Sequence, residues 1–297
     1  MELETLRHFV VIAKLGNMTR AAAQLNISQP ALSRQVQTLE TELGQPLFNR
    51  ANRQLTLTPG GHYLVNHAEE LLTLADKTVA NMTQQQVLSG KLYIGAGETR
   101  GMQPLVTAFE TLHRAHPGVQ LKLFSGASQD VFTKLDNGIL DFGLITDPQL
   151  NSSYDSLALP SLDRWGVLLR SSDPLAKNTV ITPTDLLGKP LIFSQQTTAI
   201  ERLRRWSNQQ LTDQQVVATY NLIYNASLLA QAGLGYVIGI AGLINTSGDS
   251  ELCFRPLSPT MTTKLGLIWP RKRPLSPVAS HFLTTLQAQL NPDSKKS

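Results

Sequence analysis

One stretch of the chain, Thr19 to Leu57, constrains the fold more than any other. Thr19 to Leu25 is an apolar segment that predicts a short helix, and Asn26-Ile27 predicts a tight corner after it. Ser28 then stands where its hydroxyl can cap a second helix, and Pro30 falls in the first turn of that helix, where a missing backbone donor costs nothing. Two helices joined by so short a corner predict a helix-turn-helix, the motif that places side chains on base edges in a DNA major groove.

The second helix has one apolar face and one polar face. The apolar stripe at helical spacing consists of Leu32, Val36, Leu39 and Leu43. Gly44 is expected to end the helix, since glycine readily adopts the left-handed conformation found at helix C-termini. The residues that we assign to DNA contact on this helix are Ser28, Gln29, Pro30, Ser33 and Arg34. The amide of Gln29 can pair with adenine, whereas Arg34 can take guanine or a phosphate, and the sequence leaves that choice open.

A wing is predicted after this helix. Residues 47–57 contain two short apolar segments around a polar tip, which indicates a two-stranded hairpin. Arg50 and Arg53 are expected to lie along the DNA backbone or to enter the minor groove. Two interpretations without DNA stay open. The two helices could be a buried helical hairpin with a solvated polar face, and Arg50 and Arg53 could be ordinary solvated arginines. The combination of this polar set with a wing favours DNA binding.

The residues of this region closely resemble the LysR-type transcriptional regulators. The resemblance is carried by a long run of positions: Phe9, Gly16, Thr19 to Ala22, Leu25, Ile27 to Ser33, Leu39-Glu40, Leu43-Gly44, Leu47-Phe48, Arg50 and Leu57 to Gly60. So long a match is far more specific than a lone four-residue motif. It implies an N-terminal winged helix-turn-helix, an antiparallel dimerisation helix after it, and a C-terminal periplasmic-binding-protein-like pair of α/β subdomains.

A long helix is predicted to run from Pro59 to about Ser89, capped by Thr58. No Pro or Gly interrupts the chain between His62 and Ser89, and Leu and Ala recur along it. About thirty residues at about 1.5 Å each span about 45 Å, which is more than a winged helix can cover. We therefore expect residues 59–90 to form a linker and dimerisation helix that pairs with a second copy of the chain, rather than a solvent-bridging rod.

From Lys91 onward the chain alternates between strand and helix patterns, which indicates an α/β fold. The predicted strands are Lys91–Ala96, Val119–Phe124, Leu140–Ile145, Leu157–Leu159, Trp165–Leu169, Leu191–Ser194, Val216–Tyr220, Tyr236–Ile240, Leu252–Phe254 and Lys264–Trp269. The predicted helices are Gln103–His113, Ser128–Asn137, a short one after Pro183, Ala199–Gln210, Ala226–Gln231 and Pro277–Leu290. The predicted domains are therefore 1–58, 59–90 and 91–297. With the crossover that the resemblance implies, subdomain one is 91–161 plus 268–297, and subdomain two is 162–267.

Composition and charge exclude some classes of protein. No run approaches the roughly eighteen apolar residues of a membrane span, and Met1 opens directly into a helix, so we expect no signal peptide and a cytoplasmic protein. Cys253, the single cysteine, is expected to be an inert buried thiol. The pI of about 9.2 does not by itself indicate DNA binding, because residues 1–60 carry six basic against four acidic side chains.

A glycine-rich segment, Gly95 to Gly101, follows a strand and precedes a helix, which suggests comparison with a dinucleotide-binding loop. Its third glycine comes one place late, and the next strand ends at Phe124-Ser125 without the carboxylate that binds ribose. The six His and one Cys show no metal-ligand spacing, and the sequence has no nucleophile-elbow motif. We therefore expect no cofactor, no metal and no catalytic activity.

The carboxyl ends of the predicted strands gather polar side chains. In open α/β sheets ligands bind at these ends, against helix N-termini. The predicted effector contacts are Glu98, Thr99, Arg100, Ser125, Ser128 and Thr146 from subdomain one, and Gln195, Gln196 and Asn225 from subdomain two. Any one of these residues can equally be a helix cap. The resemblance favours Thr99 and Ser128, because family members commonly present Ser or Thr there to the effector.

These features predict a sequence-specific regulator of transcription rather than an enzyme. Its expected partners are double-stranded DNA, a small-molecule effector and further copies of the chain, paired through residues 59–89 and then as a dimer of dimers (a homotetramer); RNA polymerase is a further candidate. Converging helix dipoles and Arg100 favour a small organic acid as effector. The competing interpretations are an apolar or cationic ligand admitted by Glu98, or no ligand at all, with the fold serving only to form tetramers. Effector binding is expected to close the subdomains and shift the DNA-reading geometry. The alternative is a solute-binding protein or an enzyme of α/β type with no specific DNA target.

Overall fold

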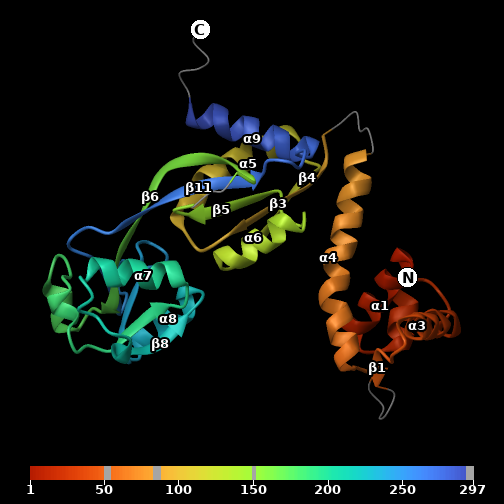
Figure 1. Cartoon of the computed structure of the whole chain (residues 1–297), viewed down its shortest axis with the longest axis horizontal. Coiled ribbons are helices and arrows are strands. Elements are labelled where there is room, and N and C mark those ends of the chain that lie inside the picture. Colours follow the sequence, from red (N-terminus) through yellow and green to blue (C-terminus); the bar gives the residue numbers. More distant parts are fainter. Residues whose placement is uncertain (50–54, 83–87, 149–151, 292–297) are drawn as a thin grey trace, which may run out of the picture. The chain divides into compact units, whose positions relative to one another are not determined.

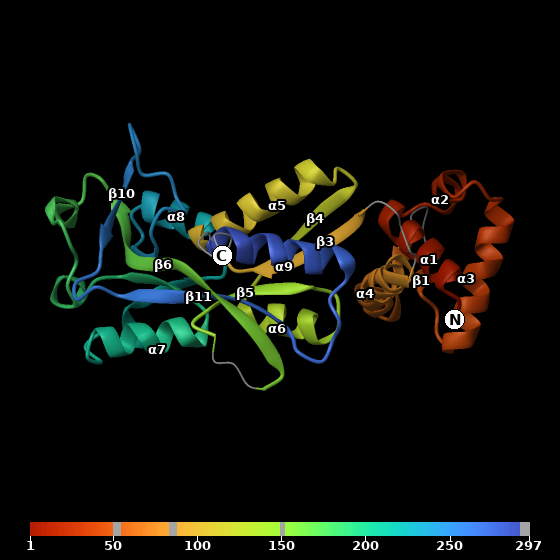
Figure 2. The same ribbon diagram turned by 90° about the horizontal axis from the view of Figure 1, so that it is seen from above.

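The computed structural model describes residues 1–49, 55–82, 88–148 and 152–291. Residue contacts divide the chain into two compact units, Met1–Gln84 and Gln85–Ser297. The first unit is mainly helical, and the second is built round a mixed sheet. Figure 1 colours the first unit red to orange and the second unit yellow to blue, and Figure 2 shows the same elements from above.

The N-terminal unit packs three helices and a small hairpin against a longer fourth helix. Its elements are α1 Leu3–Leu15, α2 Met18–Gln24, α3 Gln29–Leu43, β1 Phe48–Asn49, β2 Thr56–Leu57 and α4 Pro59–Met82. All four helices contribute to one buried core, which includes Leu6, Phe9 and Leu32. Phe9 lies against Phe48 at the base of the hairpin, with ring centroids 5.3 Å apart. The core therefore ties the helix-turn-helix to the hairpin that follows it.

Short polar residues and glycines set the ends of these helices. Asn17 and Ser28 start α2 and α3, because their side-chain oxygens accept hydrogen bonds from backbone N–H groups three residues on (2.9 and 3.3 Å). Gly16 and Gly44 end α1 and α3 with φ angles of 57° and 69°, a conformation that is costly for a residue with a side chain. The predicted caps Ser28 and Gly44 are therefore confirmed.

Helix α4 begins after Thr58, whose hydroxyl accepts a backbone hydrogen bond (3.0 Å) from its first turn. The sequence predicts that this helix reaches about Ser89, but Leu88-Ser89 lies outside any helix, so the prediction is wrong at that end. Residues 83–87 lie outside the described residues. Gly90 opens the first strand of the next unit and its N–H donates to Gly118 O (3.2 Å), which explains why the helical conformation does not continue.

The described residues of the C-terminal unit form a nine-stranded sheet in the order β4-β3-β5-β11-β6-β9-β7-β8, with β10 beside β6. Its strands are β3 Gly90–Ala96, β4 Val119–Ser125, β5 Phe142–Thr146, β6 Tyr154–Arg170, β7 Leu191–Ser194, β8 Val216–Tyr220, β9 Tyr236–Ile240, β10 Leu252–Pro256 and β11 Thr262–Pro270. Its helices are α5 Gln103–Ala115, α6 Ser128–Asp136, α7 Thr197–Trp206, α8 Ile223–Gln231 and α9 Pro277–Leu290. Short 3-10 turns are η1 Arg100–Met102, η2 Pro174–Lys177, η3 Thr184–Leu186 and η4 Asp213–Gln215. The α/β fold that the sequence predicts is confirmed.

Separate hydrophobic cores divide the C-terminal unit into two subdomains. Strands β3, β4 and β5 pack with α5, α6 and α9 in subdomain one. Strands β7, β8 and β9 pack with α7 and α8 in subdomain two. The antiparallel strands β6 and β11 lie side by side and connect the two subdomains (Figure 1). Because β3–β5 and β11–α9 both build subdomain one, subdomain two is an insertion between them.

Strand β6 is longer than the sequence predicts. The two predicted strands Leu157–Leu159 and Trp165–Leu169 belong to one strand of 17 residues. Pro160 lies between them and cannot donate a ladder hydrogen bond. The register with β11 shifts between Lys264 and Leu265, and this irregularity accommodates the proline. Connecting the subdomains therefore depends on pairing with a distant strand, which overrides the local proline signal.

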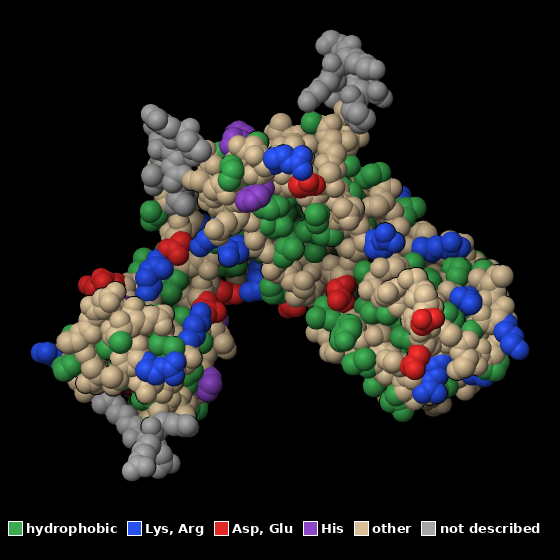
Figure 3. Space-filling view, turned by 180° about the vertical axis from the view of Figure 1, so that it is seen from behind, with side chains coloured by type: hydrophobic (Ala, Val, Ile, Leu, Met, Phe, Trp, Pro, Cys, Tyr) green, Lys and Arg blue, Asp and Glu red, His purple; other side chains and the backbone are tan. Residues whose placement is uncertain are grey.

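Charged side chains are distributed over both units. On the face shown in Figure 3, Lys and Arg side chains are spread over the surface, and several lie near Asp and Glu side chains. Cys253 on β10 is a half-buried free thiol. Within the described ranges, no helix is both long and apolar enough to cross a membrane.

Candidate functional site

Helix α3 turns the residues that the sequence assigns to DNA contact away from the core. Its buried side consists of Leu32, Val36 and Leu39. On the other side, Ser28, Gln29, Pro30 and Arg34 are exposed and Ser33 is half-buried. Arg34 Nε donates to Pro30 O (3.4 Å), and its guanidinium has no carboxylate partner in the described part of the chain. This face can offer an amide, a hydroxyl and a free cation to a DNA groove.

The hairpin after α3 is anchored at its base. Strands β1 and β2 pair antiparallel, with Phe48 opposite Leu57. The Glu40 carboxylate on α3 accepts hydrogen bonds from the backbone N–H groups of Leu47 (2.7 Å) and Phe48 (3.2 Å), which fixes where the hairpin leaves the helix. Arg50 and Arg53, which the sequence places at the tip of the hairpin, lie outside the described residues.

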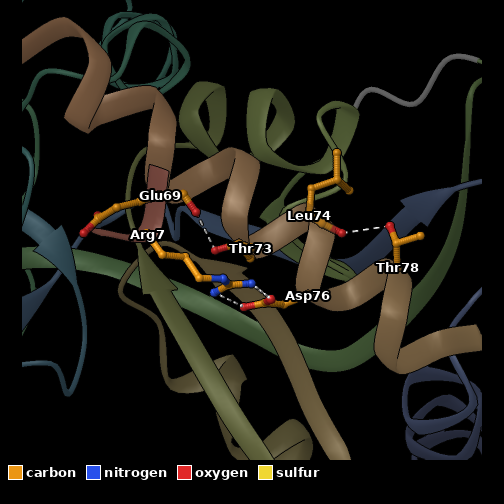
Figure 4. A network of polar contacts seen from close by, with 6 residues as sticks. All are labelled: Arg7, Glu69, Thr73, Leu74, Asp76 and Thr78. Atoms are coloured by element: carbon orange, nitrogen blue, oxygen red, sulfur yellow. Dashed lines mark hydrogen bonds and ion pairs between the residues drawn. The ribbon is translucent and has the colours of Figure 1, made fainter. Parts of the chain in front are cut away.

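Four basic side chains of the described N-terminal unit fall into two groups. Arg7 pairs with Asp76 (Figure 4), and Lys14 pairs with a second carboxylate of α4, so both cations hold α1 against that helix. Arg20 and Arg34 are exposed, and neither has a carboxylate partner among the described residues. Arg20 lies in the first turn of α2 and is a candidate phosphate contact that the sequence analysis did not assign.

A cleft of about 420 Å³ lies between the two subdomains of the C-terminal unit. Its size falls within the roughly 300–1,000 Å³ of small-molecule sites. The polar residues that line it include Glu98, Thr99, Ser128, Thr146 and Asp147 from subdomain one, and Gln196, Thr198, Glu201, Arg202 and Arg205 from subdomain two. The connecting strands β6 and β11 contribute Trp165 and Thr263, which we call the cleft floor.

Three helix N-termini border the cleft. Ser128 is the first residue of α6, Gln196 precedes α7, and Ile223 is the first residue of α8, and all three line the cleft. None of these helices is capped by the side chain of its own N-cap residue. Helix α8 is capped from the other subdomain, because Glu98 Oε2 accepts a hydrogen bond from Ile223 N (2.7 Å). Helices α6 and α7 therefore direct N–H groups and the positive ends of their dipoles toward the cleft.

In the described part of the chain, two polar contacts join the subdomains across the cleft. The first is the Glu98 cap on α8, and burial together with the charge of Glu98 raises the pKa of the nearby Tyr220 phenol, which stays neutral and donates to a backbone carbonyl. The second is the ion pair between Asp147 and Arg202. Asp147 also accepts a hydrogen bond from Lys264 N (2.7 Å). Both carboxylates from subdomain one are thus already engaged.

Two further charges of the cleft are not engaged in this way. Glu201 and Arg205 lie one turn apart on α7 and both line the cleft. Arg205 Nε donates to Glu201 O (3.4 Å), but neither charged group has an ion-pair partner within the described ranges. Arg205 is therefore available to an anionic ligand, and Glu201 repels such a ligand from its own side.

A buried carboxyl group lies next to the cleft floor. Asp163 on β6 is 3% exposed, and Thr99 Oγ1 lies 2.8 and 2.7 Å from its two oxygens and donates to it. Thr99 Oγ1 also accepts a hydrogen bond from Gly101 N (2.9 Å), which caps η1. Burial raises the pKa of Asp163, and the hydrogen bond from Thr99 opposes that rise. The Thr99 hydroxyl is thus committed to holding Asp163 in place.

The predicted effector contacts separate into two groups. The structure brings Glu98, Thr99, Ser128, Thr146 and Gln196 together in the cleft. It does not place Arg100, Ser125, Gln195 or Asn225 on the cleft lining. Arg100 packs instead beside Gly242, where an added Cβ would lie 2.6 Å from Arg100 Cδ. Ser128 does not cap α6, whose N-cap residue is Ala127.

Several lining residues were not identified from the sequence. Arg202 and Arg205 lie on a helix after the end of β7, and that position is the signal that could have found them. Asp147 follows β5 in the same way. Trp165 and Thr263 lie inside strands, where their local pattern is that of any half-buried strand residue. Only the pairing of β6 with β11 brings them to the cleft.

The chain matches two family models and several known regulators. A model described as "LysR substrate binding domain" matches residues 85–291, and one described as "Bacterial regulatory helix-turn-helix protein, lysR family" matches residues 3–62. The chain is 27% identical over 292 residues to an uncharacterized HTH-type transcriptional regulator, YnfL, of Escherichia coli. The aligned region covers 95% of this chain and 96% of that protein. It is 35% identical over 203 residues to the SDS degradation transcriptional activation protein of a Pseudomonas species, which covers 65% of each.

Solved structures show the same fold. CbnR, a LysR family transcriptional regulator, superposes with a TM-score of 0.74 at 18% identity, covering 98% of this chain and 99% of CbnR. The structure of full-length CbnR in complex with its target DNA superposes with a TM-score of 0.72 at 18% identity. The superposition covers 97% of this chain and 99% of that chain. Since the substrate-binding model alone spans more than half of the chain, and the helix-turn-helix model matches most of the N-terminal unit, this chain belongs to the LysR family: it is a DNA-binding regulator of transcription with an effector-binding domain, and not an enzyme.

Proposed function

We propose that this regulator responds to a small organic acid that binds in the cleft between its two subdomains. The observation that carries the proposal is the meeting of the α6 and α7 N-termini at the cleft, where neither is capped by its own N-cap side chain. Each such terminus favours an anion by about 0.3–1 kcal/mol. Glu98 supports the same chemistry, because the chain itself places a carboxylate on the third terminus, that of α8.

The charges that line the cleft agree with an acidic ligand of modest charge. Arg205 supplies a cation without an ion-pair partner among the described residues, whereas Asp147 and Arg202 satisfy each other. Glu201 limits the negative charge that the ligand can carry, because it would repel a second ligand carboxylate that lay next to it. Gln196 lines the cleft, and we propose that its side-chain amide bonds an uncharged polar group of the ligand.

Binding is expected to favour the closed arrangement of the two subdomains. Helix α6 belongs to subdomain one and α7 to subdomain two, so an acid touches both termini only when the cleft is closed around it. A ligand that binds one arrangement more tightly shifts the population toward it. We propose that this shift changes the spacing of the DNA-reading helices in the assembled regulator.

Roles within the DNA-binding unit follow from residue chemistry. We propose that Gln29 bonds adenine, that Pro30 packs on a thymine methyl group, and that Ser33 lies against a base edge. Arg34 takes guanine or a phosphate. Ser28, Arg50 and Arg53 are proposed to hold the DNA backbone, with Arg53 also suited to the minor groove. Binding should therefore weaken steeply as salt rises.

Assembly is proposed to occur through α4. Large apolar side chains on this helix are exposed in the single chain: Tyr63, Leu71, Leu74, Val79 and Met82. A row of apolar side chains that its own unit does not cover indicates a partner surface. We propose that a second copy of α4 covers it, that two such dimers associate, and that the assembly works on DNA in the cytoplasm, with RNA polymerase as a further partner.

Thermal-shift measurements on the full chain test the ligand proposal. Its melting temperature is measured against matched panels of small carboxylates, amines and sugars. Carboxylates are expected to raise it in a concentration-dependent manner, as mass action requires. Arg205→Gln should weaken that effect, and Glu201→Gln, which removes the opposing charge one turn away, should strengthen it. Stabilisation by amines alone would show that the cleft does not bind organic acids.

A binding assay tests the DNA proposal separately. The purified protein is titrated against DNA from upstream of its own or a neighbouring gene and against random DNA, at several salt concentrations. Specific binding should be tighter by at least about a thousandfold. Equal affinity for both DNAs would contradict the proposed base contacts of Gln29, Pro30 and Ser33.

A further inference from the structure

Three buried polar atoms have no hydrogen-bond partner among the described residues: Trp165 Nε1, Thr263 Oγ1 and Ser161 Oγ. Trp165 and Thr263 are 6% and 3% exposed, and both side chains line the cleft, whereas Ser161 does not. Native proteins pair nearly all of their buried donors and acceptors, so each exception needs a reason. Two of the three exceptions together form the cleft floor.

The backbone holds the cleft floor in a fixed arrangement. Thr263 on β11 is directly opposite Asp163 on β6, and Trp165 lies two residues further along β6, so all three occupy one face of the paired strands. The backbone N–H of Trp165 donates to Met261 O (2.9 Å), in the residue before β11. The Trp165 indole packs on Phe193, with ring centroids 6.3 Å apart. The unpaired groups therefore belong to rigid strands and not to a loop that can turn them elsewhere.

We propose that the cleft floor binds a hydroxyl group of the effector, so that the ligand is a hydroxylated organic acid. This inference rests on the proposed function for the position of the acid group. An indole N–H only donates, and a threonine hydroxyl can donate or accept. A ligand hydroxyl is the smallest group that can accept from Trp165 and at the same time donate to Thr263.

Other ligand groups fit the cleft floor less well. A carbonyl oxygen can accept from both Trp165 and Thr263, but it leaves the acceptor capacity of the Thr263 hydroxyl unused. A carboxylate would bring a second negative group next to the buried Asp163. The acid group is therefore directed to the α6 and α7 N-termini and Arg205, and the hydroxyl to the strands between the subdomains. The ligand thus has one orientation in the cleft.

Calorimetric titration of the full chain with matched pairs of acids tests this inference. Each pair consists of a short straight-chain carboxylic acid and the same acid with one hydroxyl, at successive positions along the chain. At the matching position the hydroxylated member should bind roughly tenfold more tightly. Trp165→Phe and Thr263→Val, which keep most of the packing, should each remove that advantage, so that the two members of the pair bind with equal affinity.

Ser161→Ala is the matched control, because it removes an unpaired buried hydroxyl outside the cleft. It should leave the tenfold advantage intact. If both members of every pair bind equally to the wild-type protein, the inference is wrong and the proposed organic-acid site still stands. If no acid binds, but small neutral polyols bind and lose affinity in Thr263→Val, the hydroxyl site on the cleft floor stands, but the ligand is not an acid and the proposed function is wrong. If neither acids nor polyols bind, both the inference and the proposed function are wrong.

Discussion

The face of α3 that we propose to contact DNA and the cleft between the subdomains both contain arginines, but only the cleft contains one that is paired between two distant segments of the chain. Arg34 on α3 is exposed, and within the described ranges its guanidinium bonds only a carbonyl of its own helix, as Arg205 does in the cleft. In the cleft, Arg202 is paired with Asp147, which lies 55 residues earlier in the chain. The first arrangement needs only one helix, whereas the second exists only after two subdomains have come together. A linear motif can therefore reveal the first region but not the second.

Substitutions in the hydrophobic cores should have the largest effect on stability. They test whether the N-terminal unit and subdomain one are stable independently of each other. Leu32→Ala should lower the stability of the N-terminal unit by about 2–5 kcal/mol, because it leaves a cavity in a core that the C-terminal unit does not share. Leu267→Ala should do the same to subdomain one. Hydrogen exchange resolved by segment would show each loss confined to its own unit. Equal loss of protection in both units would mean that they unfold as one body.

Arg34→Ala should weaken DNA binding by about 1–3 kcal/mol, since the side chain is free to contact a base or a phosphate. Arg7→Ala is the matched control: it removes an exposed arginine of the same unit whose charge is already paired with Asp76. It should cost stability by no more than about 1 kcal/mol and leave DNA affinity within twofold. Fluorescence anisotropy with labelled operator DNA measures both, and a larger affinity loss in Arg7→Ala would remove the distinction between the two groups of cations.

Asp147→Ala tests the cleft side of the comparison. Its carboxylate accepts from Arg202 and from Lys264 N, and removing it leaves two donors near the cleft without their acceptor. We expect the C-terminal unit to lose about 1–2 kcal/mol of stability. Asp155→Ala breaks a more exposed pair with Arg271 and should cost under about 1 kcal/mol. Urea denaturation measures the unfolding free energy of both variants. Equal losses of stability would show that the ion pair between the subdomains contributes no more than the more exposed pair.

The smallest effect concerns pH and Asp163. Burial raises its pKa in the folded protein above the ordinary value of 3.8, so the folded state binds the proton more tightly than the unfolded state does. This contribution therefore favours folding at low pH and is lost as pH rises from 3.8 through the raised pKa. Asp163→Asn should flatten the pH dependence of the unfolding free energy in that window. Identical pH profiles for the wild-type protein and Asp163→Asn would contradict the assignment.

Elements with strong local signals were predictable. The Ser28 and Gly44 caps, and strands such as β7, β8 and β9, begin and end where the sequence predicts. Helix α8 was predicted three residues too short, because its first turn is capped by Glu98 from another subdomain rather than by a nearby side chain. Likewise β6 was predicted as two strands, because Pro160 is tolerated only through the irregular register with β11.

The candidate site was only partly predictable, for a related reason. Polar residues at the end of a strand or just after it, such as Thr146 and Glu98, were found because in an open α/β sheet ligands bind at the carboxyl ends of the strands. Gln195 and Gln196 are adjacent, and the sequence cannot say which of two neighbours in an extended segment faces the cleft. Trp165 and Thr263 lie within the connecting strands, so only the tertiary pairing identifies them.

The insertion of subdomain two within subdomain one also determines the order in which a newly made chain can fold. Phe282 and Leu286 of α9 belong to the core of subdomain one, whose first strand is made almost two hundred residues earlier. Subdomain two is complete once the strands up to β11 have left the ribosome, but subdomain one must wait for the last helix. During synthesis β3 to β5 therefore remain without their full core, and this interval is when the nascent chain depends most on chaperones.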